Sequence, residues 1–127
     1  MKGSPMARVL AVDDDPTVIA LERRVLEREG YEVVTASDGA GAMALLQEQD
    51  FDLVLLDIMM PGVDGYAVSR AFRENKANRR VAVIFISSRE DTQAITEGFR
   101  AGGTLFLRKP FSANQLTRMV KGMIREP

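Results

Sequence analysis

The alternation of short apolar segments with amphipathic ones constrains the fold of this chain more than any other feature of its sequence. Segments of strand character lie at residues 8–12, 31–36, 53–57, 81–86 and 104–108, and a segment with helical spacing follows each of them. Strands that alternate strictly with helices pair in parallel, and their crossovers are right-handed. The pattern therefore predicts an α/β fold, with one doubly wound parallel sheet and helices on both of its faces.

Helix ends are marked by residues that favour caps. Asp15 followed by Pro16 opens the first helix and Gly30 ends it, Ser37 or Asp38 opens the second, and Ser112 opens the last. The first four helices are expected at residues 16–29, 38–49, 65–74 and 91–101, and a polar, basic loop is expected at residues 75–80.

Composition and charge exclude several classes of function. The 127 residues contain 17 Lys and Arg against 18 Asp and Glu, so the overall charge does not point to nucleic acid or an anionic membrane as the main partner. Cysteine and histidine are absent, which excludes disulfides, zinc–thiolate sites and Ser-His-Asp catalysis and is compatible with a reducing cytosol. The longest apolar runs are far shorter than the ~18 residues of a membrane span. Residues 1–6 are interpreted as a tag or disordered leader ahead of one domain at residues 7–125.

Chemically active side chains are found where the predicted strands end. Asp13 and Asp14 follow the first strand, Asp57 ends the third, Ser87 follows the fourth and Lys109 follows the fifth. In a parallel sheet these ends share one edge, which is where open α/β sheets bind their ligands. The topology therefore predicts that these residues meet in one site.

A cluster of carboxylates at this edge needs a cation. Like charges ~4 Å apart repel by about 4 kcal/mol at an effective dielectric near 20, and Lys109 supplies only one positive charge. Oxygen ligands without His or Cys favour a hard divalent ion such as Mg²⁺. A metal beside a carboxylate nucleophile, with an ammonium and a hydroxyl facing it, is typical of phosphoryl transfer. Asp57 is then the candidate acceptor of an acyl phosphate.

Each of these residues also has a purely structural explanation. Asp57 stands where Asp commonly caps a loop, and Lys109 precedes a proline turn. Asp13 to Asp15 precede a helix N-terminus, where acidic residues are favoured. Taken separately, these explanations remain open. If all of them held together, however, the occurrence of chemically matched side chains at four strand ends would be a coincidence.

Four motifs resemble the signatures of the receiver domain of two-component response regulators. They are VDDDP at residues 12–16, LDIMMPGVDG at 56–65, FISSR at 85–89 and KPF at 109–111. They occur in the family's order and at its spacing, and the resemblance covers about residues 7–124. It implies a flavodoxin-like fold with five strand–helix units and the strand order 2-1-3-4-5.

The resemblance also implies a role for each matching residue. Asp57 would take a phosphoryl group from the phosphohistidine of a sensor histidine kinase or a histidine phosphotransfer protein. Asp14, Asp57 and the backbone carbonyl of Met59 would ligate Mg²⁺, with Asp13 acting directly or through water. Lys109 would pair with a phosphoryl oxygen, and its bond to the following proline is expected to be cis.

Two further positions match the family's conformational switch. Ser87 stands at the position of the switch hydroxyl, where Thr is more frequent, and Phe106 stands at that of the switch aromatic, where Tyr is frequent. The implied output surface is the face made by the fourth helix, the fifth strand and the fifth helix. Met59 and Arg89 lie at positions that influence attack of water on the acyl phosphate in the family, although Met59 is equally explained as a packing residue and Arg89 as a solvated charge.

The sequence therefore predicts a cytoplasmic signalling module whose intrinsic activity is self-phosphorylation and autodephosphorylation, and not an enzyme with an external substrate. Its expected partners are the phosphohistidine protein and an output domain or effector protein, with no direct contact to nucleic acid or membrane. A homodimer through the output face is one candidate assembly. Two alternatives remain open. One is an aspartyl-phosphate hydrolase, in which a second acid usually stands where this chain has Met59, and the other is an unphosphorylated receiver-like binding module.

Overall fold

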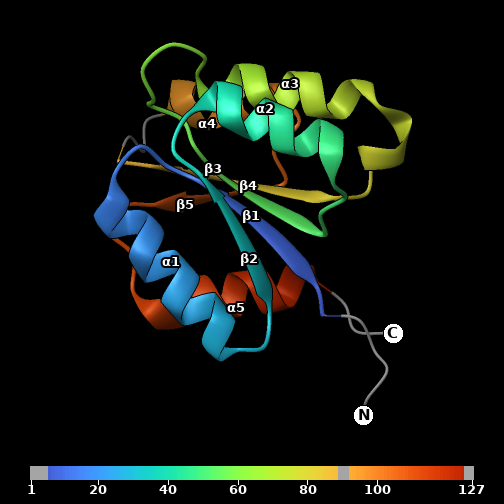
Figure 1. Ribbon diagram of the computed structural model, residues 1–127. Coiled ribbons are helices and arrows are strands. Elements are labelled where there is room, and N and C mark those ends of the chain that lie inside the picture. The colour runs from blue at the N-terminus through green and yellow to red at the C-terminus, as the bar shows by residue number, and fades with distance from the viewer. Residues whose placement is uncertain (1–5, 89–91, 125–127) are drawn as a thin grey trace.

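The computed structural model describes residues 6–88 and 92–124, and its centre is one parallel sheet. The expected leader at residues 1–6 falls almost wholly outside the described residues. The five strands are β1 (Arg8–Val12), β2 (Glu32–Ala36), β3 (Leu53–Asp57), β4 (Ala82–Ser87) and β5 (Leu105–Arg108). Their order in the sheet is β2-β1-β3-β4-β5, which confirms the predicted fold class and strand order (Figure 1).

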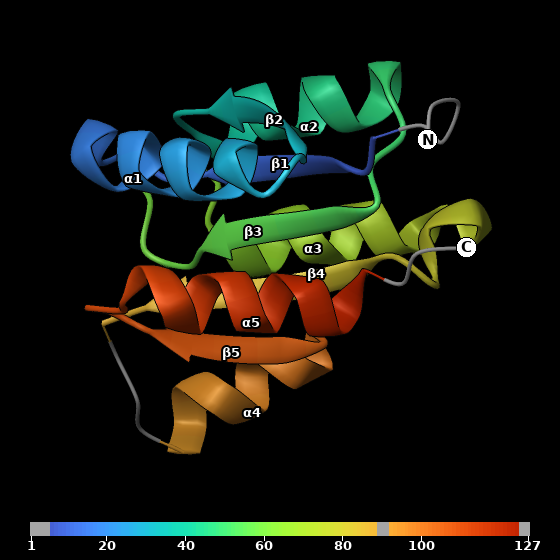
Figure 2. The same ribbon diagram turned by 90° about the horizontal axis from the view of Figure 1, so that it is seen from below.

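Helices cover both faces of the sheet, as the doubly wound topology requires. Helices α1 (Pro16–Arg28) and α5 (Ala113–Met123) lie together on one face. Helices α2 (Gly39–Glu48), α3 (Gly65–Glu74) and α4 (Thr92–Arg100) lie on the other. Figure 2 shows α1 and α5 in front of the sheet, with α2 and α3 behind it. None of the helices in the described part of the chain has the length and apolar character that crossing a bilayer requires.

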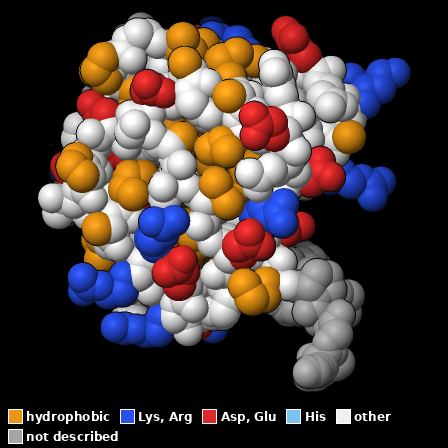
Figure 3. Space-filling model, in the orientation of Figure 1, with side chains coloured by type: hydrophobic (Ala, Val, Ile, Leu, Met, Phe, Trp, Pro, Cys, Tyr) orange, Lys and Arg blue, Asp and Glu red, His pale blue; other side chains and the backbone are white. Residues whose placement is uncertain are grey.

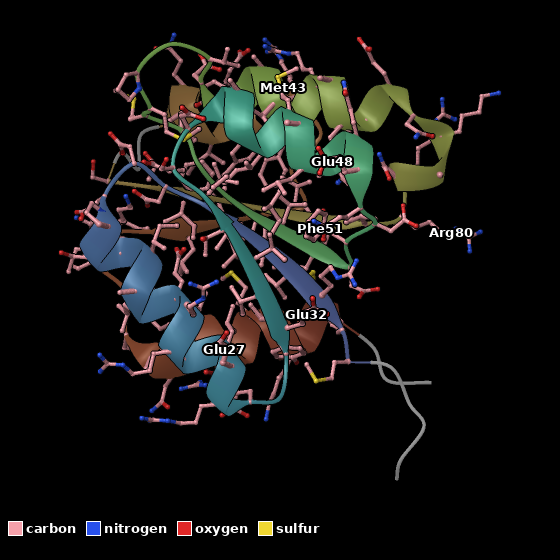
Figure 4. All side chains as sticks on the ribbon, in the orientation of Figure 1. Glu27, Glu32, Met43, Glu48, Phe51 and Arg80 are labelled. Carbon is pink, nitrogen blue, oxygen red and sulfur yellow. The ribbon has the colours of Figure 1, made fainter. Side chains whose placement is uncertain are left out.

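The core consists of two apolar layers that share the central strands. Every residue of β3 and β4 is buried, because these strands lie inside the sheet and are covered on both faces. Alternate residues point to opposite layers, so that Leu55 packs with α1 and α5 whereas Leu56 packs on the α2–α3 side. Phe51, just before β3, is 5% exposed and belongs to the second layer (Figure 4).

The register of the strands brings the predicted site residues to one edge. Val12 lies opposite Ala36 on one side and Leu56 on the other, Asp57 lies opposite Ile86, and Ser87 lies opposite Arg108. Because all strands run in the same direction, the chain leaves each of them at the same edge.

Most predicted caps are present. Asp15, Asp38 and Ser112 each accept a hydrogen bond from a backbone N–H in the first turn of their helix, and Ser112 forms a capping box. Gly30, in the left-handed region at φ +94°, follows the end of α1.

The segment before β4 differs from its predicted structure. Residues 75–80 were expected as a loop, but they contain a 3₁₀ turn at Lys76–Asn78 that the side chain of Asn75 caps. Strand β4 begins at Ala82 and not at Val81, because the Val81 N–H donates to the carbonyl of Asn78 and the Val81 carbonyl accepts from Arg73.

Figure 3 shows acidic and basic side chains interspersed with apolar ones on the face of the molecule that carries β2 and α2. This mixture agrees with the nearly balanced composition of the chain.

Candidate functional site

Asp13 and Asp14 follow β1 and differ in exposure. Asp13 is 1% exposed, its backbone N–H continues the sheet by donating to the carbonyl of Ala36, and its Oδ1 accepts the N–H of Asp15 at 2.9 Å. Asp14 is exposed to solvent. The end of β1 therefore carries one buried carboxylate, that of Asp13, which a backbone hydrogen bond orients, and one carboxylate, that of Asp14, which is accessible to ions in solution.

Asp57 is the last residue of β3 and is 4% exposed. Its Oδ1 accepts a hydrogen bond from the backbone N–H of Met59 at 3.3 Å. The loop that follows folds back on this residue, because the Gly65 N–H donates to the carbonyl of Ile58 at 3.2 Å. A side chain at Gly65 would collide with the carbonyl of Asp57, so only glycine allows this close approach.

Lys109 carries the positive charge that these carboxylates share. Its Nζ lies 2.8 Å from Oδ2 of Asp13 and 3.6 Å from Oδ2 of Asp57. Its backbone N–H donates to the carbonyl of Ser87 at 2.8 Å, and its bond to Pro110 is cis, as expected. Burial lowers the pKa of Lys109, but the hydrogen bond to Asp13 and the surrounding carboxylates outweigh burial, so that the net pKa is raised.

The site has the donor set of a hard divalent ion. Asp13, Asp14 and Asp57 each offer a carboxylate oxygen, and these oxygens lie within 4.8 Å of one another. Burial, reinforced by the charge of Asp13, raises the pKa of Asp57 to about 6, although Lys109 acts in the opposite direction. The single ammonium therefore does not offset the combined effect of burial and the neighbouring negative charge. Three oxygen donors at this spacing fit Mg²⁺, which these carboxylates would hold.

The predicted switch residues lie on the two strands that end beside this site. Ser87 is the last residue of β4 and is fully buried. Phe106 is a half-buried residue of β5 that packs against the apolar layer on the α2–α3 side. Ser87 thus lies next to Lys109, whereas Phe106 lies further along the sheet. Arg89 lies outside the described residues.

Hollows on two sides give access to the acidic site. One has a volume of about 550 Å³, lies between α1 and β2, and is lined by Ile19, Arg23 and Thr35 among others. The second has a volume of about 600 Å³ and is lined by Met59 and other residues of the β3–α3 loop. Asp14 borders both hollows, so a partner can approach it from either side. The Met59 side chain is 57% exposed, which contradicts the alternative that it only fills a gap.

Sequence reasoning missed one residue near the site, Glu22 of α1. This side chain is 1% exposed, and neither of its carboxylate oxygens has a hydrogen-bond partner among the described residues. Burial, reinforced by the charge of Asp13, raises the pKa of Glu22 to about 8. Ile19, Glu22 and Leu26 follow the spacing of an apolar helix stripe, and this signal in the sequence could have identified Glu22 as a core position.

Comparisons with known proteins agree with this fold. Residues 9–121 match the family described as "Response regulator receiver domain". The chain is 38% identical over 118 residues to the transcriptional regulatory protein ResD of Bacillus subtilis (strain 168), covering 93% of this chain and 48% of ResD. It is 33% identical over 120 residues to the DNA-binding dual master transcriptional regulator RpaA of Synechocystis sp. (strain ATCC 27184 / PCC 6803 / Kazusa), covering 94% and 50%.

The chain thus spans about half the length of these curated relatives. Among solved structures, the chemotaxis protein CheY4 of Vibrio cholerae superposes with a TM-score of 0.90 at 31% identity, covering 94% of this chain and 99% of CheY4. The match to the family extends over most of the sequence and includes every predicted site residue, from Asp13 to Lys109. The chain therefore belongs to the response regulator receiver domain family.

Proposed function

We propose that this receiver domain accepts a phosphoryl group on Asp57 from a partner's phosphohistidine and thereby changes the surface formed by α4, β5 and α5. Receiver domains of response regulators are signalling modules and not enzymes with an external substrate. One observation supports the proposal above all others: Asp13, Asp14, Asp57 and Lys109 converge from three strand ends on one accessible point.

The chemistry follows from the positions of these groups. An oxygen of Asp57 attacks phosphorus, the bond from phosphorus to the imidazole nitrogen breaks, and the imidazole is released. The residues 1–127 contain no histidine, so the donor lies outside them. Bound Mg²⁺ would neutralise phosphoryl oxygens. Lys109, which holds Asp13 and Asp57 in the structure described here, would exchange its contact with Asp57 for a phosphoryl oxygen.

Phosphorylation changes the charge at the end of β3, and this change is the proposed signal. An acyl phosphate adds a doubly charged group with three strong acceptor oxygens. The hydroxyl of Ser87, at the end of the neighbouring strand, would be recruited towards these oxygens. Phe106 would then repack beside it, and the output face would change its shape. Met59 and Arg89 are proposed to influence how fast water removes the phosphoryl group.

The partners and the location are part of the same proposal. The donor would be a sensor histidine kinase or a histidine phosphotransfer protein, and the signal would pass to an output domain or an effector protein. Support comes from the names of the relatives, which include transcriptional regulatory proteins of about twice this length. A homodimer through the output face and a cytoplasmic location are predictions from the family resemblance alone.

Phosphorylation with a small donor tests the proposal directly. The protein is incubated with phosphoramidate and Mg²⁺, and its intact mass is measured for the wild type, for Asp57→Asn and for Asp50→Asn. Asp50 is an exposed aspartate outside the site, so its variant controls for the loss of a carboxylate. We expect one added phosphoryl group in the wild type and in Asp50→Asn, and none in Asp57→Asn.

The intact mass, together with a parallel incubation in which inorganic phosphate released from a phosphomonoester is measured, separates the two alternatives. An aspartyl-phosphate hydrolase would release inorganic phosphate continuously from an external phosphomonoester, over many turnovers. An unphosphorylated binding module would keep its unmodified mass in the wild type as well. Either result would overturn the proposal.

A further inference from the structure

Two hydroxyl hydrogen bonds, one partly and one fully buried, join helix α3 to the segment that contains α4. Tyr66 donates from its hydroxyl to the carbonyl of Ala94 at 3.1 Å, near the start of α4. Ser69 donates from its Oγ to the carbonyl of Ala101 at 2.6 Å, just after the end of α4. The Ser69 side chain is fully buried, so this hydrogen bond is shielded from competing water.

Two arginines extend the same row of contacts. Arg70 forms an ion pair with Glu97 of α4. Arg73 donates from Nε and Nη2 to the carbonyl of Gly102 at 3.0 and 2.8 Å. The donors Tyr66, Ser69, Arg70 and Arg73 are spaced i, i+3, i+4 and i+7, which places them on one face of α3. We call these four contacts the α3–α4 tie.

Apolar packing holds α4 only weakly, so its position depends strongly on the contacts of the α3–α4 tie. The fully buried residues of this segment are small: Ala94, Gly98 and Ala101, while the larger Ile95 is only partly buried. The large apolar residue Phe99 is 50% exposed. Because little apolar surface is buried by such small residues, α4 gains little from the hydrophobic effect. Figure 2 shows α4 beside β5 at the edge of the sheet, where neighbouring elements are few.

The N-terminal end of α3 packs against the end of β3, where Asp57, the proposed phosphorylation site, is located. Helix α3 begins at Gly65, which packs against the carbonyl of Asp57 so closely that no side chain fits. The first donor of the tie, Tyr66, is the next residue. A rearrangement of the loop after Asp57 therefore moves the first turn of α3, and with it the hydroxyl that holds α4.

We propose that the α3–α4 tie couples the loop after Asp57 to helix α4, holding α4 in place until phosphorylation rearranges the loop and releases it. This inference rests on the proposed function, because it needs Asp57 to be phosphorylated. The route is distinct from the one through Ser87 and Phe106, since it runs along α3 and not along β4 and β5.

A double variant removes two contacts of the tie with minimal change in shape. Tyr66→Phe deletes the hydroxyl but keeps the ring, whose centroid lies 5.4 Å from that of Phe85. Glu97→Gln deletes the charge that pairs with Arg70. The matched control makes the same two chemical changes elsewhere. Tyr31→Phe with Glu32→Gln alters a tyrosine in the apolar layer of the α1–α5 face and a glutamate of β2 that pairs with Arg8 (Figure 4).

Amide hydrogen exchange of the whole domain, without phosphoryl donor, is the first measurement. We expect about tenfold faster exchange of the backbone amides in residues 92–103 of the double variant, since a hydrogen bond and an ion pair that hold this segment are lost. Exchange in the control variant should match that of the wild type in this segment. Equal exchange in all three proteins would show that the contacts of Tyr66 and Glu97 do not hold α4 and would overturn the proposal. Ser69→Ala provides a second, single-atom variant of the same kind.

Exchange after phosphorylation with phosphoramidate and Mg²⁺ tests the coupling itself. In the wild type and the control, phosphorylation should accelerate exchange in residues 92–103. In the double variant the further acceleration should be smaller, because α4 has already lost the Tyr66 hydrogen bond through which the loop acts on it. An equally large acceleration in the double variant would overturn the coupling. If the wild type takes up no phosphoryl group, the proposed function fails, whereas the first measurement still decides whether the tie holds α4.

Discussion

Glu22 places a carboxyl group in a part of the core where a hydrocarbon side chain would normally pack. Both of its oxygens lack hydrogen-bond partners among the described residues, and its neighbours on α1 include the buried Val25 and Leu26. An unpaired carboxylate in such surroundings is costly, so the group keeps its proton instead. This is why its pKa is raised to about 8.

Replacing Glu22 by leucine should stabilise the domain. The change removes a buried polar group and supplies apolar surface of similar size, so we expect the free energy of unfolding to rise by about 1–3 kcal/mol at pH 8. Urea denaturation in the presence of a chelator measures the effect. Glu22→Gln, which keeps the shape but cannot ionise, is the matched comparison. A Glu22→Leu protein of equal or lower stability at pH 8 would contradict this account.

The pH dependence of stability gives a second readout of the same residue. The pKa of Glu22 rises from its ordinary 4.5 to about 8 on folding, so between these values the unfolded chain has lost a proton that the folded protein keeps. Wild-type stability should therefore fall as the pH rises through this window. The raised pKa of Asp57, about 6, acts in the same direction. Glu22→Gln should consequently show a smaller, but not absent, decline from pH 5 to pH 8 in the same denaturation experiment.

Arg73 connects elements that are remote in the sequence. Besides Gly102, its guanidinium donates to the carbonyls of Asn78 and Val81, both at 2.6 Å, and so joins α3 to the turn before β4 and to the turn after α4. Gly102 has φ +98°, and a Cβ there would lie 2.7 Å from the Arg73 side chain. Burial lowers the pKa of Arg73, and the carbonyl groups around it supply the compensating hydrogen bonds.

Arg73→Met should destabilise the domain much more than a surface arginine does. The variant keeps most of the apolar stem but leaves several partly buried carbonyls without a donor, so we expect a loss of about 2–4 kcal/mol in the free energy of unfolding. Arg80→Met is the control. This residue extends outward from the same turn (Figure 4) and is exposed, so its loss should cost less than about 0.5 kcal/mol. Similar denaturation midpoints for the two variants would show that Arg73 does not hold these turns together.

The elements that could be predicted from sequence are those whose first and last residues are determined by their neighbours in the chain. Helix α1 begins at Pro16 because Asp15 caps it, and β3 ends at Asp57 because the apolar run ends there. The start of β4 could not be predicted in the same way. It depends on Arg73 of α3, whose guanidinium donates a hydrogen bond to the carbonyl of Val81. The 3₁₀ turn at Lys76–Asn78 and the α3–α4 tie depend equally on contacts that no local pattern contains.

At the scale of the whole molecule, the site was predictable because topology converts sequence order into proximity. Because the strands are parallel, their carboxyl ends lie at one edge of the sheet, and this edge carries Asp13, Asp57 and Lys109. In the structure, the ammonium of Lys109 lies beside both carboxylates. The differences in exposure within the site were not predictable. Asp13 is buried because its backbone N–H still pairs with the carbonyl of Ala36 at the end of the sheet, whereas Asp14 lies beyond this last hydrogen bond and is exposed.

This difference makes Asp14 the residue with which to test Mg²⁺ binding. Without metal, an exposed carboxylate contributes little to folding, so Asp14→Asn should be about as stable as the wild type in a chelator. Binding to the folded state raises stability by RT ln(1 + [L]/Kd), about 2.7 kcal/mol when the ion is present at 100 times its Kd. We expect Mg²⁺ to raise the melting temperature of the wild type and of Asp50→Asn, and to have much less effect on Asp14→Asn.

The comparison distinguishes specific from general binding of Mg²⁺, because each variant lacks a single acidic residue and keeps all the others. A general effect of divalent ions on a domain with 18 Asp and Glu would shift all three melting temperatures alike. A site formed by Asp13, Asp14 and Asp57 would make the shift saturate with Mg²⁺ concentration and depend on Asp14. An equal, non-saturating shift in all three proteins would therefore show that these carboxylates do not bind Mg²⁺ specifically. The proposed neutralisation of a phosphoryl group beside Asp57 by the metal would then fail as well.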